Sequence, residues 1–104
     1  MIDGSFYYLF VALTLGGSKN MLTGIKYVVV TNSEEERQEL REVIFSKKLA
    51  ASVMTGAKGK QYIAICTGDV WFLTTIGEER VSTNHYQIFN SVAEFIQFFN
   101  KNNL

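Results

Sequence analysis

The 104-residue chain contains no proline and only one cysteine and one histidine. The single thiol, Cys66, cannot form an intramolecular disulfide, which is typical of proteins from a reducing compartment. No second cysteine or histidine is present to complete a zinc site. The sequence therefore predicts neither a metal site nor a cofactor.

The chain also lacks net charge, because ten Lys and Arg residues balance ten Asp and Glu residues. Nucleic-acid binding normally requires a concentrated positive surface, so the composition argues against a nucleic-acid partner. A neutral chain has little charge repulsion to keep its copies apart. A homo-oligomer is therefore one expected assembly.

The chain also lacks an apolar run long enough to span a membrane, which requires about 20 residues. The one candidate, Phe6–Leu15, stops at Gly16-Gly17 and is preceded by Asp3 instead of the positive charge of a secretory signal. We interpret this run as a buried strand, with a cleaved signal as the alternative. We expect no membrane association and a cytoplasmic location.

Hydrophobic residues make up 47% of the chain and aromatic residues 13%, which indicates a compact core. The length is that of one typical domain, so residues 1–104 are predicted to form a single globular unit. Met21 provides a second potential start. Residues 1–20 are accordingly either an N-terminal extension or an extra strand.

Two segments begin with a Ser-x-x-Glu capping box, which is typical of helix N-termini. They are Ser33–Glu36, which follows the apolar strand Ile25–Thr31, and Ser91–Glu94, which precedes apolar residues at helical spacing. The sequence therefore predicts two helices, the first ending near Lys48.

The region between the two helices is predicted to be mostly strand. Gln61–Thr67 and Val70–Ile76 flank a tight glycine turn, which is a hairpin signal, and shorter strands are expected at 51–55 and 86–89. Both faces of Gln61–Thr67 are apolar, so this strand should be central. We predict an α+β fold: a five- or six-stranded, mainly antiparallel sheet with two helices in a single layer on one face.

The first helix carries an acidic run, Glu34, Glu35, Glu36, Glu39 and Glu42, with Arg37 and Arg41 interspersed. We interpret this run as a solvated face that could also dock a basic partner. The two chain ends are rich in aromatic residues. Those that are not buried in the core can form an association surface. The candidate partner-binding residues are Glu35, Glu39, Phe98 and Trp71.

Few residues suggest catalysis. The glycine–lysine segment 55–60 lacks the spacing of a phosphate-binding loop and is followed by a strand, so it is interpreted as a turn. Cys66 and His85 are the one Cys–His pair, but Cys66 lies in an apolar strand, where a thiol behaves as a small hydrophobe. We predict no catalytic residues, and we name Lys58, Lys60 and His85 as candidate ligand-binding residues.

The segment Val28–Val53, about a quarter of the chain, resembles the first βα unit of the CutA family. The shared features are Thr31, the acidic helix start and the segment Lys48–Val53, in which Ser52 stands where the family usually has cysteine. The strand with Tyr or Trp next to Gly that follows in the family is not found after Val53. The resemblance implies a trimeric, ferredoxin-like protein that binds a small molecule, and it implies no functional residue.

Three hypotheses follow from the sequence. The first is a non-enzymatic interaction or regulatory module, for example an inhibitor encoded by a phage or mobile element. The second is an oligomeric small-molecule-binding signalling protein, CutA-like in type, with a site between subunits near Lys58, Lys60 and His85. The third, a small enzyme using Cys66 or His85, has the least support because no paired acid, base or metal cluster accompanies them.

Overall fold

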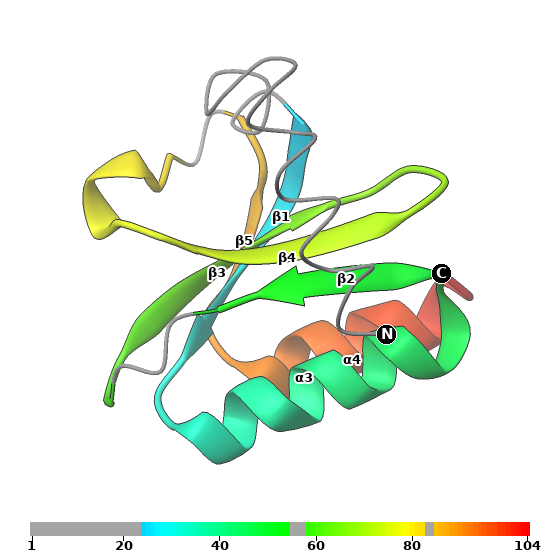
Figure 1. Cartoon of the computed structure of the whole chain (residues 1–104), viewed down its shortest axis with the longest axis horizontal. Helices are drawn as coiled ribbons and strands as arrows, with labels where there is room; N and C mark the ends of the chain where they lie inside the picture. The colour runs from blue at the N-terminus through cyan, green and yellow to red at the C-terminus, as the bar shows by residue number, and fades with distance from the viewer. Residues whose placement is uncertain (1–23, 55–57, 83–84) are drawn as a thin grey trace.

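The computed structural model describes residues 24–54, 58–82 and 85–104. Within these ranges, five strands form one sheet and two α-helices cover one of its faces (Figure 1). The α+β class and the single helical layer are therefore confirmed. The predicted strand Phe6–Leu15 and the extension 1–20 lie outside the described residues. No helix of the described part has the length and hydropathy needed to cross a bilayer.

The sheet has the strand order β2-β4-β3-β1-β5, so β3 is central, as predicted. The strand bounds are β1 Ile25–Thr31, β2 Ala50–Val53, β3 Gln61–Cys66, β4 Trp71–Ile76 and β5 Gln87–Phe89. The bounds of β1 are those expected from the sequence. Those of the other four strands differ from expectation by at most a few residues at an end.

The sheet is mainly antiparallel, as predicted, but it is mixed because it also contains parallel strand pairs at both edges. The central pairs β1–β3 and β3–β4 are antiparallel, whereas the outer pairs β2–β4 and β1–β5 are parallel. The first helix returns the chain to the end of the sheet where β1 begins, so β2 runs in the same direction as β1. The β3–β4 hairpin then fills the space between β1 and β2.

The first helix, α3, spans Glu34–Lys47 and begins with the predicted capping box. The Ser33 hydroxyl accepts a hydrogen bond from the Glu36 amide at 3.2 Å. Glu36 Oε1 in turn accepts from the amide of Asn32, at 2.8 Å, one residue before the expected cap amide. The cap therefore fixes the entry of the chain into α3 from both sides.

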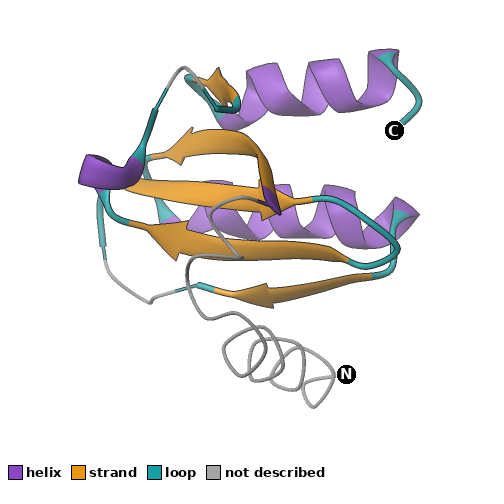
Figure 2. Ribbon diagram, turned by 90° about the horizontal axis from the view of Figure 1, so that it is seen from above, coloured by secondary structure: helices purple, strands orange, loops and turns teal. Residues whose placement is uncertain are grey.

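The second helix, α4, spans Val92–Lys101 and has the same arrangement. The Glu94 amide donates to the Ser91 hydroxyl at 3.1 Å, and the Asn90 amide donates to Glu94 Oε1 at 3.3 Å. The two helices lie side by side against the sheet, with α3 on the β2 side and α4 on the β5 side (Figures 1 and 2).

The main core fills the space between the helices and the sheet, and Tyr27 lies at the centre of its aromatic part. The Tyr27 ring packs against four other rings at centroid distances of 5.5–6.4 Å. These rings belong to Trp71, Phe89, Phe95 and Phe98. Edge-to-face and tilted ring pairs of this kind add stability beyond the burial of their area. Most of the aromatic excess in the described part of the chain is therefore core.

A smaller apolar cluster lies on the other face of the sheet, around the buried residues Ile25, Val28 and Ala64. The segment 77–86 contributes Val81 and Tyr86 to this cluster and contains a short 3₁₀ helix, η1, Glu78–Arg80. The Tyr86 hydroxyl donates to the carbonyl of Arg80 and accepts from the amide of Ser82. These bonds join Tyr86 to Arg80 and Ser82.

The cap of α4 gives a first prediction. Ser91→Ala removes the acceptor for the Glu94 amide and should lower the free energy of unfolding by about 1 kcal/mol, measured by urea denaturation. Ser46→Ala, an exposed change of the same type inside α3, is the matched control and should have an effect within about 0.5 kcal/mol. Equal losses in the two variants would contradict a capping role.

Candidate interaction surface

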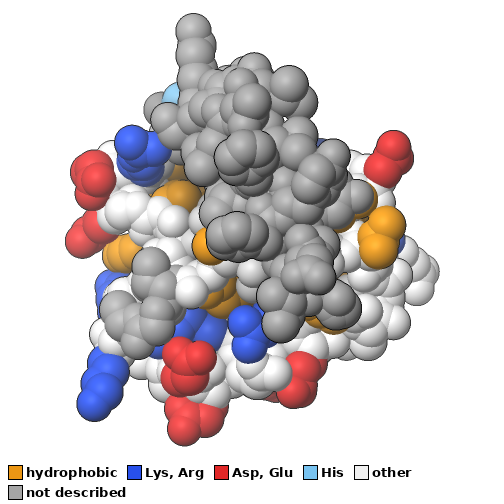
Figure 3. All heavy atoms as spheres, in the orientation of Figure 1, with side chains coloured by type: hydrophobic (Ala, Val, Ile, Leu, Met, Phe, Trp, Pro, Cys, Tyr) orange, Lys and Arg blue, Asp and Glu red, His pale blue; other side chains and the backbone are white. Residues whose placement is uncertain are grey.

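An acidic row lies on the side of α3 that faces away from the sheet. Glu35, Glu39 and Glu42 are exposed and follow one another at spacings of four and three residues, which places them on one face of the helix. The opposite side of α3 carries Leu40 and Ile44, both fully buried. Acidic side chains gather along the lower edge of Figure 3, over α3.

Two apolar side chains are exposed near the C-terminal end of α3, one within the helix and one in the segment between the helix and β2. Phe45 is 44% exposed and Leu49 is 70% exposed, and they are the large hydrophobic side chains recorded as exposed among the described residues. Phe45 lies three residues after Glu42 and therefore close to the end of the acidic row. We call Glu35, Glu39, Glu42 and Phe45 the α3 outer face; Leu49 follows the helix and lies beyond its end.

The lysines at the end of α3 are directed away from this face. Lys47 Nζ donates to the side-chain oxygen of Asn100 at 3.1 Å and lies 5.5 Å from the centre of the Phe99 ring. Lys48 Nζ lies 5.4 Å from the centre of the Trp71 ring. Both ammonium groups are thus held over aromatic rings of the core. Neither one covers the exposed apolar pair.

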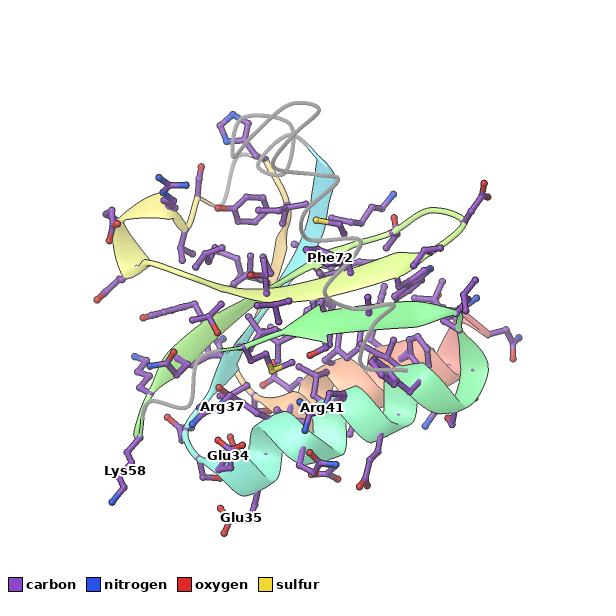
Figure 4. All side chains as sticks on the ribbon, in the orientation of Figure 1. Glu34, Glu35, Arg37, Arg41, Lys58 and Phe72 are labelled. Carbon is purple, nitrogen blue, oxygen red and sulfur yellow. The ribbon has the colours of Figure 1, made fainter. Side chains whose placement is uncertain are left out.

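The two arginines of α3 have different environments. Arg41 is half-buried on the flank of the helix and donates to the side-chain oxygen of Gln38. Arg37, by contrast, is only 2% exposed. The prediction that both arginines belong to a solvated face is therefore wrong for Arg37. Figure 4 shows Arg37 on the sheet side of α3 and Glu35 on the far side.

The guanidinium of Arg37 joins three parts of the fold. Its Nη1 donates to the hydroxyl of Thr31, at the end of β1, at 2.9 Å and to the carbonyl of Gly59, just before β3, at 3.0 Å. Its Nη2 lies 3.7 Å from a carboxylate oxygen of Glu34. The Thr31 hydroxyl in turn donates to the carbonyl of Gln61 at 3.1 Å. Arg37 is therefore a structural residue that fixes α3 to the sheet.

A sequence signal for this role exists. Arg37 precedes Leu40 by three residues and Ile44 by seven, so it lies on the apolar side of α3 with them. An arginine can occupy such a position when hydrogen-bond acceptors meet its guanidinium. Those acceptors come from residues distant in the sequence, which is why the pattern alone suggested a solvated side chain.

The predicted aromatic contacts lie elsewhere. Trp71 is 6% exposed and packs against Phe99 at a ring-centroid distance of 5.7 Å, so it is a core residue and its prediction as a surface contact is corrected. Phe98 is half-buried, with the Phe89 ring 5.0 Å from its own. Among the described residues, the large apolar side chains that are exposed are instead Phe45 and Leu49.

The predicted ligand-binding residues are not brought together within one chain. Lys58 and Lys60 are exposed just before β3, whose first residue, Gln61, pairs with Thr31 at the end of β1. His85 is exposed two residues before β5, whose first residue, Gln87, pairs with Tyr27 of β1, so His85 lies near the beginning of β1. At about 3.3 Å per residue, these positions are separated by roughly 20 Å along β1. A site that uses all three residues requires a second subunit.

Cys66 has the wrong electrostatic environment for a nucleophile. It is half-buried at the end of β3, and burial raises the pKa of its thiol to about 11 from 9.0. A catalytic thiol requires a lowered pKa. In the described ranges, no three His, Cys, Asp or Glu side chains are grouped so that they could hold a metal ion.

The chain matches no protein-family model, no curated protein and no solved structure. The described elements also depart from the fold implied by the CutA resemblance. A ferredoxin-like domain has the order βαββαβ, whereas here four strands separate α3 from α4 and the described chain ends in a helix. The structure thus gives the ferredoxin-like expectation no support.

The buried arginine gives a second prediction. Arg37→Met keeps the aliphatic bulk but leaves two acceptors without their donor, and we expect the free energy of unfolding to fall by about 2–3 kcal/mol in urea denaturation. The matched control is Arg41→Met, which should change it by less than about 0.5 kcal/mol. Similar losses in the two variants would show that Arg37 is not a structural contact.

Cys66 gives a third prediction. Its thiol deprotonates near pH 9.0 in the unfolded chain and near pH 11 in the folded chain, so the unfolded state binds fewer protons between these values. Stability should therefore fall as the pH rises from 9 to 11, and more steeply than in Cys66→Ser. The midpoint of thermal unfolding, recorded across this range for both proteins, measures the difference. Parallel curves would refute the raised pKa.

Proposed function

We propose that this chain is a small protein-interaction module that binds a protein partner through the α3 outer face. The observation that carries the proposal is the exposure of Phe45 at the end of an otherwise acidic helix face, together with that of Leu49 just beyond the helix. Elsewhere in the described core, large apolar side chains are buried or half-buried. Exposed apolar groups bordered by charged residues are typical of protein-binding surfaces.

The energetics favour contact over solvation at these two positions. Burial of a Phe or Leu side chain that water would otherwise cover contributes about 1.5–3 kcal/mol. The lysines that could shield the pair by lying across it are directed toward Phe99 and Trp71 instead. The pair therefore remains accessible to a partner.

The mode of action that fits such a module is occupation of a partner's surface. We propose that it regulates or inhibits its partner in this way and converts no substrate itself. The raised pKa of the Cys66 thiol agrees with a non-enzymatic role. The partner is a different protein or, in a homo-oligomer, a second copy of this chain.

A differential capture experiment tests the proposal. The chain is immobilised and exposed to an extract of its own cells, next to a Phe45→Ser/Leu49→Ser variant. We expect the original chain to retain a protein that the variant loses, because the variant no longer offers apolar atoms for burial. Light scattering on the free chain identifies the case in which the partner is a second copy.

The matched control is Glu78→Gln/Glu79→Gln, which changes two exposed residues of η1, away from α3. This control should retain the same protein as the original chain. Urea denaturation of each variant verifies that its fold is intact. Capture that is identical for all three proteins, with no self-association of the free chain, would refute an interaction through the α3 outer face.

A further inference from the structure

The basic and the acidic side chains of α3 lie on different sides of the helix. The guanidinium of Arg37 is buried on the sheet side, and the ammonium groups of Lys47 and Lys48 lie over rings of the core. The exposed carboxylates of Glu35 and Glu39 have no counterpart among the ion pairs and hydrogen bonds of the described residues. A helix with basic residues in its sequence therefore presents an acidic outer face.

The remaining polar groups near this face do not neutralise it. Glu42 Oε2 accepts a hydrogen bond from the uncharged amide of Gln38 at 3.0 Å. Arg41 lies on the flank and donates to the same Gln38 side chain. Figure 3 shows Lys and Arg side chains between the acidic edge and the sheet, and others along the left side of the molecule. The electrostatic potential over Glu35, Glu39 and Glu42 is therefore expected to be negative.

We propose that the partner presents a cationic amphipathic segment, which lies along α3 with its basic residues over Glu35, Glu39 and Glu42 and its apolar residues over Phe45 and Leu49. This inference rests on the proposed function and names the chemistry of its partner. The face extends from Glu35 to Phe45, about 15 Å at 1.5 Å per residue, so a helical segment of about 10 residues or more can cover it.

This choice of occupant follows from charge complementarity. An acidic row attracts a basic segment and speeds its association, while it repels nucleic acid, anionic lipid and acidic peptides. The apolar pair lies at one end of the row only, so the partner segment has a defined direction. A second copy that used the same face would place acidic rows near each other.

The test uses a defined probe, an amphipathic helical peptide of lysine and leucine about 14 residues long. Its binding to the full chain is measured by fluorescence anisotropy at about 50 mM salt, where screening is weak. Glu35→Lys/Glu39→Lys should weaken binding about tenfold or more, because attraction becomes repulsion. Phe45→Ser/Leu49→Ser should weaken it as well.

The matched control is Glu78→Lys/Glu79→Lys, which changes the net charge by the same amount at η1. This variant should bind within about twofold of the original chain if position on α3 matters more than net charge. Equal weakening in the two charge-reversal variants, or equal binding of a glutamate–leucine peptide, would overturn the inference.

The inference and the proposed function can fail separately. In the capture experiment, Glu35→Lys/Glu39→Lys is tested next to Phe45→Ser/Leu49→Ser. Loss of the captured protein in the serine variant only would keep the interaction module and refute the cationic partner. Loss in both variants would support the two together, whereas loss in neither would refute both.

Discussion

The burial of one cation, the guanidinium of Arg37, determines how α3 lies on the sheet. Its hydrogen bonds reach the last residue of β1 and the carbonyl of Gly59 before β3, so one side chain connects a strand, a helix and a turn. Placing a charge in the interior is costly unless such partners meet it. Because Arg37 occupies the sheet side of α3, residues about half a turn away, such as Glu35 and Glu39, must face outward. The orientation of the candidate interaction surface therefore follows from a contact in the core.

The same sorting of charge explains how a chain of zero net charge presents an acidic surface. Basic side chains have long aliphatic stems that can pack on apolar groups, and their cationic ends interact favourably with aromatic rings. Lys47 and Lys48 use both properties against Phe99 and Trp71. The shorter carboxylates of Glu35, Glu39 and Glu42 have no such ring contacts and are exposed to solvent. Composition alone excludes a strongly basic protein, but it does not describe the charge of a particular face.

The parts of the fold that depend on local sequence were predictable. The two capping boxes, the buried strand Ile25–Thr31 and the hairpin around Gly68 are each encoded within a few residues. The parallel outer strand pairs were not predictable, because they depend on where α3 and the segment 77–86 return the chain to the sheet. The exposure of Glu35 and Glu39 was predicted correctly, because it follows from the local charge pattern of the helix. The burial of Trp71 was not predicted, because Trp71 is buried by the rings of Tyr27 and Phe99, which come from other elements.

The size of the exposed apolar pair constrains how binding can work. Because Phe45 is 44% and Leu49 70% exposed, burial of their exposed parts contributes only about 2–3 kcal/mol in total, whereas association of two proteins costs roughly 4–15 kcal/mol in lost freedom of motion. The pair alone therefore cannot support a stable complex. The contact has to extend over neighbouring surface, and the acidic row of α3 is the part of the outer face that adjoins the pair. Since attraction between exposed charges weakens as salt is added, a complex formed in this way should depend strongly on ionic strength.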